Sequence, residues 1–509
     1  MKALRYYIIT ILILGFAGAS ASVSAQDVAA LKVGAAQTDI TPVNFPSICG
    51  GTMVELWYDK VLDPLSARCI VIENKEITLA LVIVDSNMIP RSVCDEAKKK
   101  AHELTGIPIN RILISATHTH AAPSVMNFAL GLSADEAYAK MLAAKIADGI
   151  ALAHVRLKPA KMGWTVFDAP EFTHCRRWVR EAGKYQRDPF GEMTVRASLG
   201  KAKHAAGPVD EQLSLLSFVS LEGDQPIALL ANFSMHYFRY KPGGFSADYF
   251  GLFSDTLAKK IVAKNEAAGN MLVAMSQGTS GDCGWQNHAG PSKYPKMQEY
   301  STRLADVAYQ AYQKIEYKEK IPLSMLESKL LITRRLPSKK RLAWAEKINQ
   351  VRGDKRPGNT PEVYAEQVTW IDQNQDEELV LQVIRLGEIA LTAMPNEVYG
   401  VTGLKLKAQS PFKATFNLSL ANGAAGYIPP PEQHYLGGYT TWPSRTAGLE
   451  VNAEPKIVDT LLGMLEKLSG GKKRKNLTTD FYTEQQRQSL KDAKAVNNNA
   501  ENRGANRDK

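Results

Sequence analysis

The chain of 509 residues carries a net charge of +10, with 45% hydrophobic and 22% charged residues. These proportions are typical of globular proteins, and they exclude collagen-like, coiled-coil and wholly disordered chains. Residues 471–509 hold ten Lys and Arg against five Asp and Glu. The rest of the chain is therefore close to neutral and lacks the basic face that a nucleic-acid-binding protein needs, so we expect no nucleic-acid partner.

The N-terminus has the three parts of a secretory signal. Lys2 and Arg5 precede an apolar run over Tyr6–Ala17, and small residues lead to Val23-Ser-Ala25. The run is too short to span a bilayer comfortably, and no later stretch is long and apolar enough to do so. We therefore expect residues 1–25 to be a signal peptide and the mature chain to be exported, to the periplasm or outside the cell, without a transmembrane anchor.

Residues 26–470 are predicted to form one large α/β domain around a mixed sheet. Apolar runs separated by short polar turns predict pairs of strands, and apolar residues at helical spacing predict the helices between them. The expected strands are Arg68–Glu73, Ile77–Val84, Arg111–Ala116, Leu213–Leu221, Ile227–Asn232, Met271–Met275, Leu379–Leu386, Ile389–Ala393 and Phe416–Leu420, and the expected helices follow Pro90 and cover Ala247–Ala263.

Residues able to bind a metal stand where the predicted strands end. His118 and His120 follow one strand, His236 ends a second and Glu397 follows a third. Active sites of α/β proteins gather at strand ends because the loops converge there. Two histidines, one glutamate and an open position form a recognised catalytic zinc set. From spacing alone, histidines that only cap a strand and an exposed loop carboxylate are the favoured explanation, because the four residues are widely scattered along the chain.

Three motifs resemble the N-terminal catalytic domain of neutral (non-lysosomal) ceramidases, and the resemblance extends over residues 33–468. The string Ser115-Ala-Thr-His-Thr-His120 is the most specific, and Asp39-Ile-Thr-Pro42 and Asp63-Pro-Leu65 support it. The resemblance implies a zinc-dependent amidohydrolase whose active site lies at strand ends. The immunoglobulin-like domain that ceramidases carry at the C-terminus has no counterpart here, so the resemblance covers the catalytic domain alone.

The resemblance implies a set of metal-site residues. His118 and His236 look like the two histidine ligands of Zn²⁺, and Glu397, in Met-Pro-Asn-Glu, looks like the third ligand. Tyr427, in Gly-Ala-Ala-Gly-Tyr, is similar to a tyrosine that sits beside the zinc ion and completes the metal site.

The resemblance also implies catalytic roles. Tyr427 is expected to stabilise the oxyanion, and His120 to face the amide of the substrate. Tyr439 looks like a second tyrosine of the site, and Arg176 like an arginine that faces the substrate, with Arg177 as a close rival. In loops rich in Gly and Pro, tyrosines often only pack and make local hydrogen bonds.

One segment departs from the family pattern. A family loop of the form Gly-Asp-x-Ser-Pro appears here as Gly281-Asp-Cys-Gly-Trp285, so Gly284 stands in place of a serine. The neighbouring Cys283 offers a thiol, although a thiol with no evident base is usually inert. The chain has five cysteines, and their spacing assigns no disulfide.

Residues 471–509 differ from the domain before them. They open on a cluster of basic residues, contain a run of three asparagines and hold few apolar residues. This composition favours a disordered tail. A solvated chain end is the simpler interpretation, and a weak contact with an anionic surface is the alternative.

Three functions are consistent with these patterns. The first is an exported zinc hydrolase that cleaves the amide bond of ceramide or of another N-acyl compound. The second keeps the fold and the metal but acts on a carbohydrate or other ester, or as a lyase or dehydratase on oligosaccharides. The third is a metal-binding protein with little catalysis. A substrate groove lined by apolar side chains would favour a lipid, whereas one lined by Trp, Asn and Arg would favour a sugar.

Overall fold

The computed structural model describes residues 31–191, 194–200, 202–263, 271–290, 295–475 and 480–505. The predicted signal peptide and its cleavage site lie outside the described residues. Within the described ranges, no helix combines the length and apolar character needed to cross a lipid bilayer.

The larger of the two main sheets has nine strands in the order β16-β15-β14-β7-β1-β4-β5-β6, with β18 beside β7. Most neighbours are antiparallel, but β5–β6 and β15–β16 are parallel because a helix, α1 or α3, returns the chain between them. The strands are β1 (Leu31–Asp39), β4 (Ser66–Glu73), β5 (Thr78–Val84), β6 (Ile112–Ala116), β7 (Lys158–Asp168), β14 (Gln212–Ser220), β15 (Pro226–Phe233), β16 (Leu272–Gln277) and β18 (Tyr317–Lys318).

The second sheet has four strands in the order β19-β20-β21-β23. Its strands are β19 (Leu323–Thr333), β20 (Asp376–Leu386), β21 (Ile389–Ala393) and β23 (Ala414–Leu418). The two sheets pack face to face through one apolar core, to which the larger sheet contributes Leu81 and Phe218 and the smaller one Leu391 and Phe416. Burial of this core supplies the main free energy that holds the sheets together.

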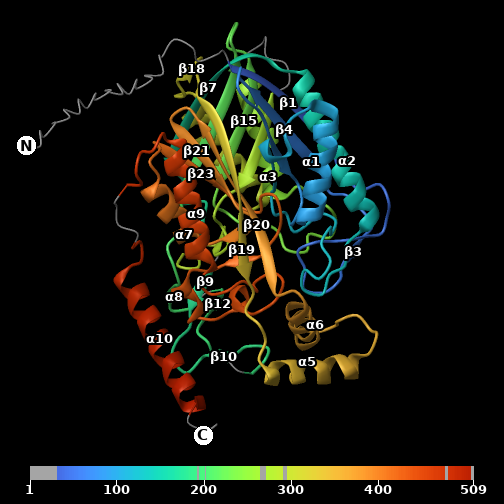
Figure 1. The fold of residues 1–509 in the computed structure, drawn as a ribbon, viewed down its shortest axis with the longest axis vertical. Coiled ribbons are helices and arrows are strands. Elements are labelled where there is room, and N and C mark those ends of the chain that lie inside the picture. Colours follow the sequence, from blue (N-terminus) through green and yellow to red (C-terminus); the bar gives the residue numbers. More distant parts are fainter. Residues whose placement is uncertain are drawn as a thin grey trace, which may run out of the picture.

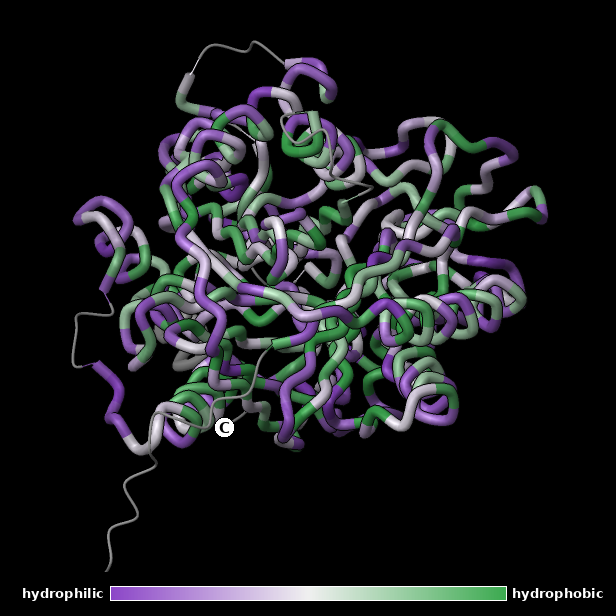
Figure 2. Tube along the Cα trace, turned by 90° about the horizontal axis from the view of Figure 1, so that it is seen from above, coloured by the Kyte–Doolittle hydropathy of each residue, from purple (hydrophilic) through white to green (hydrophobic). Residues whose placement is uncertain are grey.

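Helices cover the outer faces of both sheets (Figure 1). On the larger sheet, α2 (Glu136–Val155) packs against β1 and β4 and against α1 (Arg91–Thr105). In the same way α3 (Asp248–Val262) packs against β16, and α4 (Met297–Tyr312) packs against α3 and contacts β7 and β14. On the smaller sheet lie α7 (Gly400–Gln409) and α9 (Ala453–Leu468). Figure 2 shows hydrophobic segments running through the interior and hydrophilic segments in the outer loops.

The remaining helices and strands lie outside the two main sheets and the helices that cover them. The helices among them are α5 (Lys339–Arg352), α6 (Thr360–Gln373), α8 (Pro431–His434) and α10 (Glu484–Ala505), with 3-10 turns at Ile109–Arg111 and Tyr439–Thr441. The short strands are β2 (Ser47–Ile48), β3 (Trp57–Tyr58), β8 (His174–Cys175), β9 (Arg177–Val179), β10 (Gln186–Arg187), β11 (Thr194–Val195), β12 (Ala197–Leu199), β13 (His204–Ala205), β17 (Cys283–Gly284), β22 (Glu397–Val398) and β24 (Tyr427–Ile428).

The predicted fold class, an α/β domain on a large mixed sheet, is confirmed, and each predicted strand overlaps a strand of the structure. Within the segment predicted as a disordered tail, residues 484–505 form α10 in the structure. Leu490 and Ala493 of this helix, and Tyr482 just before it, are buried in a cluster with Tyr399 and Leu436. The composition of this segment, which is poor in apolar residues, does not predict the helix, because only a few contacts on one face hold it against an apolar surface of the domain.

Candidate metal centre and catalytic site

His118 follows β6 in a strained backbone conformation. Its φ is +71°, in the left-handed region that residues other than glycine rarely adopt. The hydrogen bonds from Thr117 N to Val84 O and from His118 N to Ser86 O hold the turn to the end of β5. Strain of this kind persists where surrounding contacts impose it, and it is common at functional sites. Here it directs the imidazole of His118 into the loops beyond the sheet.

Four side chains from three segments meet at that point. His118 Nε2 lies 3.1 Å from His236 Nε2 and 3.4 Å from His120 Nε2. Glu397 Oε2 lies 3.0 Å from His118 Nε2 and 3.8 Å from His236 Nε2. His118, His236 and Glu397 are each at most 3% exposed. The structure therefore brings together the three ligands that the resemblance implies, with His120 beside them.

Hydrogen bonds to the Nδ1 atoms of His118 and His236 determine which ring nitrogen is left free to bind a metal ion. His118 Nδ1 lies 2.8 Å from Asn87 O, and His236 Nδ1 lies 3.1 Å from Ser280 O. A carbonyl oxygen only accepts, so both Nδ1 atoms donate, and in the neutral rings the Nε2 lone pairs face the cluster. Burial, with the nearby Arg176 cation, holds the pKa of His236 well below its ordinary value, which keeps this ring neutral.

The cluster fits a bound metal ion. Three acceptor atoms converge here: the Nε2 atoms of His118 and His236, and Glu397 Oε2. Glu397 Oε2 is buried and has no hydrogen-bond partner among the described residues. Buried acceptors left this way are rare unless a cation satisfies them. Tetrahedral zinc with bonds of about 2.0–2.1 Å to nitrogen separates its ligand atoms by about 3.3 Å, close to the spacings seen here. Histidine nitrogens and carboxylate oxygens are ordinary zinc donors.

Tyr427 reaches the cluster because its strand pairs with the strand of Glu397. β22 and β24 are parallel, and Glu397 and Tyr427 stand opposite each other in their register. The Tyr427 hydroxyl lies 3.1 Å from the Tyr439 hydroxyl. Burial, and then the Glu397 carboxylate, raise the pKa of Tyr427 well above its ordinary value. Its hydroxyl therefore keeps its proton at neutral pH and can donate it.

Arg176, and not Arg177, faces the site. Arg176 Nη2 donates to the Tyr427 hydroxyl at 3.0 Å and to Gly281 O at 2.8 Å, and its guanidinium carbon lies 5.9 Å from the centre of the Tyr439 ring. Arg177 instead donates to Gln433 Oε1 at 2.6 Å, away from this cluster. The alternative that the sequence left open between these two residues is thus resolved by geometry.

Sequence reasoning missed Tyr237. Its ring stacks on His120 with 3.6 Å between the ring centroids, and the two planes are tilted by 29°. Gly51 also lies against His120: it has φ +75°, and a Cβ there would lie 2.4 Å from His120 Cγ. Tyr237 follows His236 directly at the end of a strand, so an aromatic residue next to a candidate ligand was the available signal.

Gly284, at the position of the family serine, is half-buried on β17. A Cβ at Gly284 would lie 3.4 Å from Arg176 Cβ, which is ordinary contact, so the fold itself does not exclude a side chain. Cys283 is fully buried, and burial raises the pKa of its thiol well above the ordinary value. A thiol in that setting is a poor nucleophile. All five cysteines are buried free thiols.

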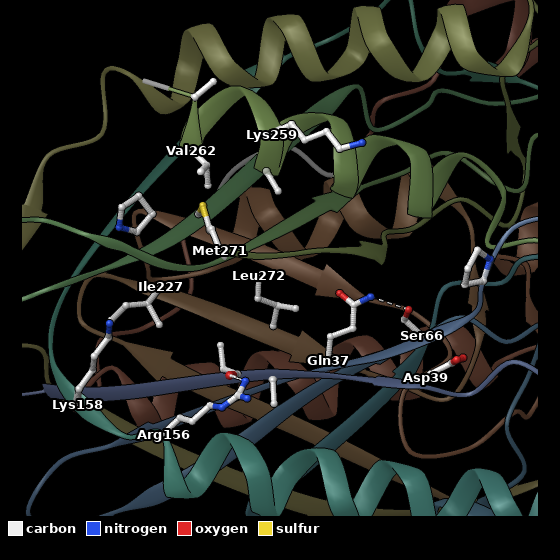
Figure 3. A pocket seen from close by; sticks show the side chains of 16 residues that line it. Gln37, Asp39, Ser66, Arg156, Lys158, Ile227, Lys259, Val262, Met271 and Leu272 are labelled. Atoms are coloured by element: carbon white, nitrogen blue, oxygen red, sulfur yellow. Dashed lines mark hydrogen bonds between the residues drawn. The ribbon is translucent and has the colours of Figure 1, made fainter. Parts of the chain in front are cut away.

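Two clefts differ in what lines them. A cleft of about 1160 Å³ lies between the end of α2 and α3, where Arg156, Lys158 and Lys259 border an apolar floor (Figure 3). It contains none of the candidate site residues. A cleft of about 270 Å³ is lined by both Arg176 and His236. Of these two clefts, the smaller one therefore borders the cluster.

Comparison with protein-family models and with curated proteins gives no match. Among solved structures, the chain is similar to "neutral ceramidase from Pseudomonas aeruginosa", with a TM-score of 0.63 and 16% identity over 87% of this chain and 75% of that one. This chain has the neutral ceramidase fold. A second similar structure, "Ceramidase complexed with C2", gives a TM-score of 0.64 and 14% identity over 88% of this chain and 77% of that one. The ceramidase resemblance drawn from three short motifs is confirmed at the level of the fold.

Proposed function

We propose that this protein is a zinc-dependent hydrolase that cleaves the amide bond of an N-acyl substrate. The observation that carries the proposal is the convergence of His118 Nε2, His236 Nε2 and Glu397 Oε2 at one buried point. The ceramidase fold supports the same class of reaction, since the similar structures are named as ceramidases. Those names make an N-acyl lipid of the ceramide class the first substrate to test.

His118, His236 and Glu397 would hold the zinc ion, with Tyr427 beside it. When bound, zinc lowers the pKa of a water molecule to about 7 and polarises a carbonyl oxygen. The Asn87 and Ser280 carbonyls fix the two imidazole rings in the orientation that ligation needs. Such outer hydrogen bonds typically change metal affinity or activity by about 10- to 100-fold.

Tyr427 would stabilise the oxygen that becomes negatively charged when the amide carbonyl is attacked. Its hydroxyl is protonated, buried and fixed by Arg176 Nη2 at 3.0 Å and by Tyr439 at 3.1 Å. A donor fixed in advance costs no reorganisation during the reaction, and removing one typically slows turnover by about 100- to 1000-fold. Arg176 and Tyr439 would act as positioning residues for Tyr427, and both would also border the substrate.

His120 would carry a proton to the leaving nitrogen. Burial and the neighbouring His118 hold the pKa of His120 well below its ordinary value, so the ring is neutral at pH 7 and can accept a proton and pass it on. The stack on Tyr237 keeps the ring from turning away. Because His120 Nε2 is 3.4 Å from His118 Nε2, it lies within reach of an amide held against the cluster.

The location that we propose for this reaction is outside the cytoplasm. The proposal depends on residues 1–25, whose charged start, short apolar core and small-residue end match a secretory signal. Secretion of a tagged full-length chain, with N-terminal sequencing of the exported product, tests it. A product beginning near Gln26 supports export, and a cytoplasmic product that retains Met1 contradicts it.

The test of the function compares two buried tyrosines. The zinc-loaded protein should release a carboxylic acid and an amine from an N-acyl substrate, and Tyr427→Phe should lower kcat by about 100-fold or more while keeping the bound zinc. Tyr300→Phe removes the hydroxyl of another buried tyrosine, which donates to Phe172 O outside the cluster, and should keep its turnover. Equal turnover in Tyr427→Phe and the unmodified protein would contradict the oxyanion role.

A further inference from the structure

The residues that line the smaller cleft limit which chemical group of a substrate can lie next to the bond that is cleaved. It has a volume of about 270 Å³ and is lined by His236 and Arg176 of the candidate site. Its other walls come from three segments, at residues 199–200 where β12 ends, at residues 237–240 after β15 and at residues 283–288. A group bound between these segments therefore lies beside the cluster.

Aromatic rings form much of this lining. The centroids of Tyr237 and Tyr240 are 6.3 Å apart, and Tyr240 is 51% exposed. In the third segment, Trp285 stacks on Phe238 with 4.6 Å between the centroids. The π face of an aromatic ring is negative and attracts the polarised C–H bonds on the flat side of a sugar ring. Two aromatic walls beside a reactive centre suit a ring better than a flexible chain.

Polar groups line the same cleft. Gln286, His288 and Arg176 all line the cleft, together with the two tyrosines. Gln286 is half-buried, and its amide carries both hydrogen-bond donors and an acceptor. A ligand rich in hydroxyl groups would pair with groups of this kind, whereas a hydrocarbon chain would leave them unpaired at a cost in affinity.

The size and the scarcity of hydrocarbon side chains exclude a long acyl chain from the cleft. Its volume is just below the about 300–1000 Å³ that small-molecule sites span. Leu199 and Phe238 are the purely hydrocarbon side chains that line it, and Leu199 is 49% exposed. One sugar ring with a short acyl group fits this space, and two long chains would extend into solvent.

We propose that the substrate is an N-acylated amino sugar with a short acyl group, and that its ring binds between Tyr240 and Trp285. This inference rests on the proposed hydrolase function and names its substrate class. In the reaction, the oxygen of water bonds to the acyl carbon, the carbon–nitrogen bond breaks, and a proton of that water goes to the nitrogen. The products are a short carboxylic acid and an amino sugar.

The test uses the zinc-loaded chain and three probes: the β-1,4-linked disaccharide of N-acetylglucosamine, a short-chain ceramide, and p-nitrophenyl acetate as an acyl compound without a sugar. We expect release of acetate from the disaccharide, with a kcat/KM that exceeds that for ceramide. Tyr240→Ala should raise KM for the disaccharide by about tenfold, and Tyr240→Phe, which keeps the ring face, should change it by less than about threefold. Tyr185→Ala, an exposed tyrosine outside the cleft, should match the unmodified protein.

Binding and turnover together separate this inference from the proposed function. Disaccharide binding is measured independently by calorimetry. If p-nitrophenyl acetate or ceramide is cleaved in a Tyr427-dependent manner but the disaccharide neither binds nor reacts, the sugar inference is overturned and the hydrolase function stands. If the disaccharide binds in a Tyr240-dependent manner and none of the probes is cleaved, ring recognition stands and the hydrolase function is overturned.

Discussion

Arg176 and Arg177 are neighbours in the chain, yet their side chains serve different parts of the molecule. Arg176 donates to the Tyr427 hydroxyl and to Gly281 O at the edge of the cluster. Arg177 is 2% exposed and donates to Gln433 Oε1 and Gly437 O, which fixes the loop around α8. The first therefore bears on the reaction and the second on the stability of that loop.

Exchanging each arginine for lysine should separate these roles. Lysine cannot make the two bonds that Arg176 Nη2 makes from a fixed planar group, so Arg176→Lys should lower kcat by about 10- to 100-fold with a small change in the unfolding midpoint. Arg177→Lys should show the reverse, with a lower midpoint and retained turnover. Steady-state kinetics and urea unfolding of both variants check this. A larger loss of turnover in Arg177→Lys would contradict the assignment.

For single residues, the sequence predicts which side chains form the candidate site but not how far apart they lie. His118, His236 and Glu397 could be named because they stand near predicted strand ends in short motifs, and Tyr427 because its motif resembles one of the ceramidase family. Their distances, and the stack of Tyr237 on His120, depend on segments more than 100 residues apart that only the fold brings together. No local pattern contains that information.

The helices and strands likewise divide into those that a local sequence pattern predicts and those that depend on distant parts of the chain. β20 and β21 lie almost where they are predicted, because an apolar run, a two-residue turn and a second apolar run form a local hairpin. β1 and β19 contain polar residues and glycine or lysine that blur their alternation, and their strand character depends on long-range partners. α10 was missed for the same reason, since its stability comes from the surface that it covers.

The docking of α10 can be tested at a single position. Leu490 is 8% exposed and packs in the cluster that also contains Tyr427 and Leu436, whereas the adjacent Lys491 is exposed. Leu490→Ala should lower the free energy of unfolding by about 2 kcal/mol, and Lys491→Ala should change it by less than about 0.5 kcal/mol. Urea unfolding measures both. Equal stability of the two variants would mean that the helix does not pack through Leu490.

Across the whole molecule, the candidate metal centre joins the two sheets. His118 and His236 follow β6 and β15 of the nine-stranded sheet, and Glu397 follows β21 of the four-stranded sheet. An ion held by all three would tie these loops together. Binding to the folded state alone would stabilise it, by about 2.7 kcal/mol when free zinc is at 100 times its Kd.

The most direct measurement is the zinc content and the thermal unfolding midpoint of the full chain, with His118→Ala and His154→Ala beside it. His154 lies on α2, outside the cluster. We expect one zinc ion per chain and a midpoint raised by zinc in the unmodified protein and in His154→Ala, and neither in His118→Ala. One zinc ion retained by His118→Ala, or none bound by the unmodified protein, would contradict the metal centre on which the proposed function rests.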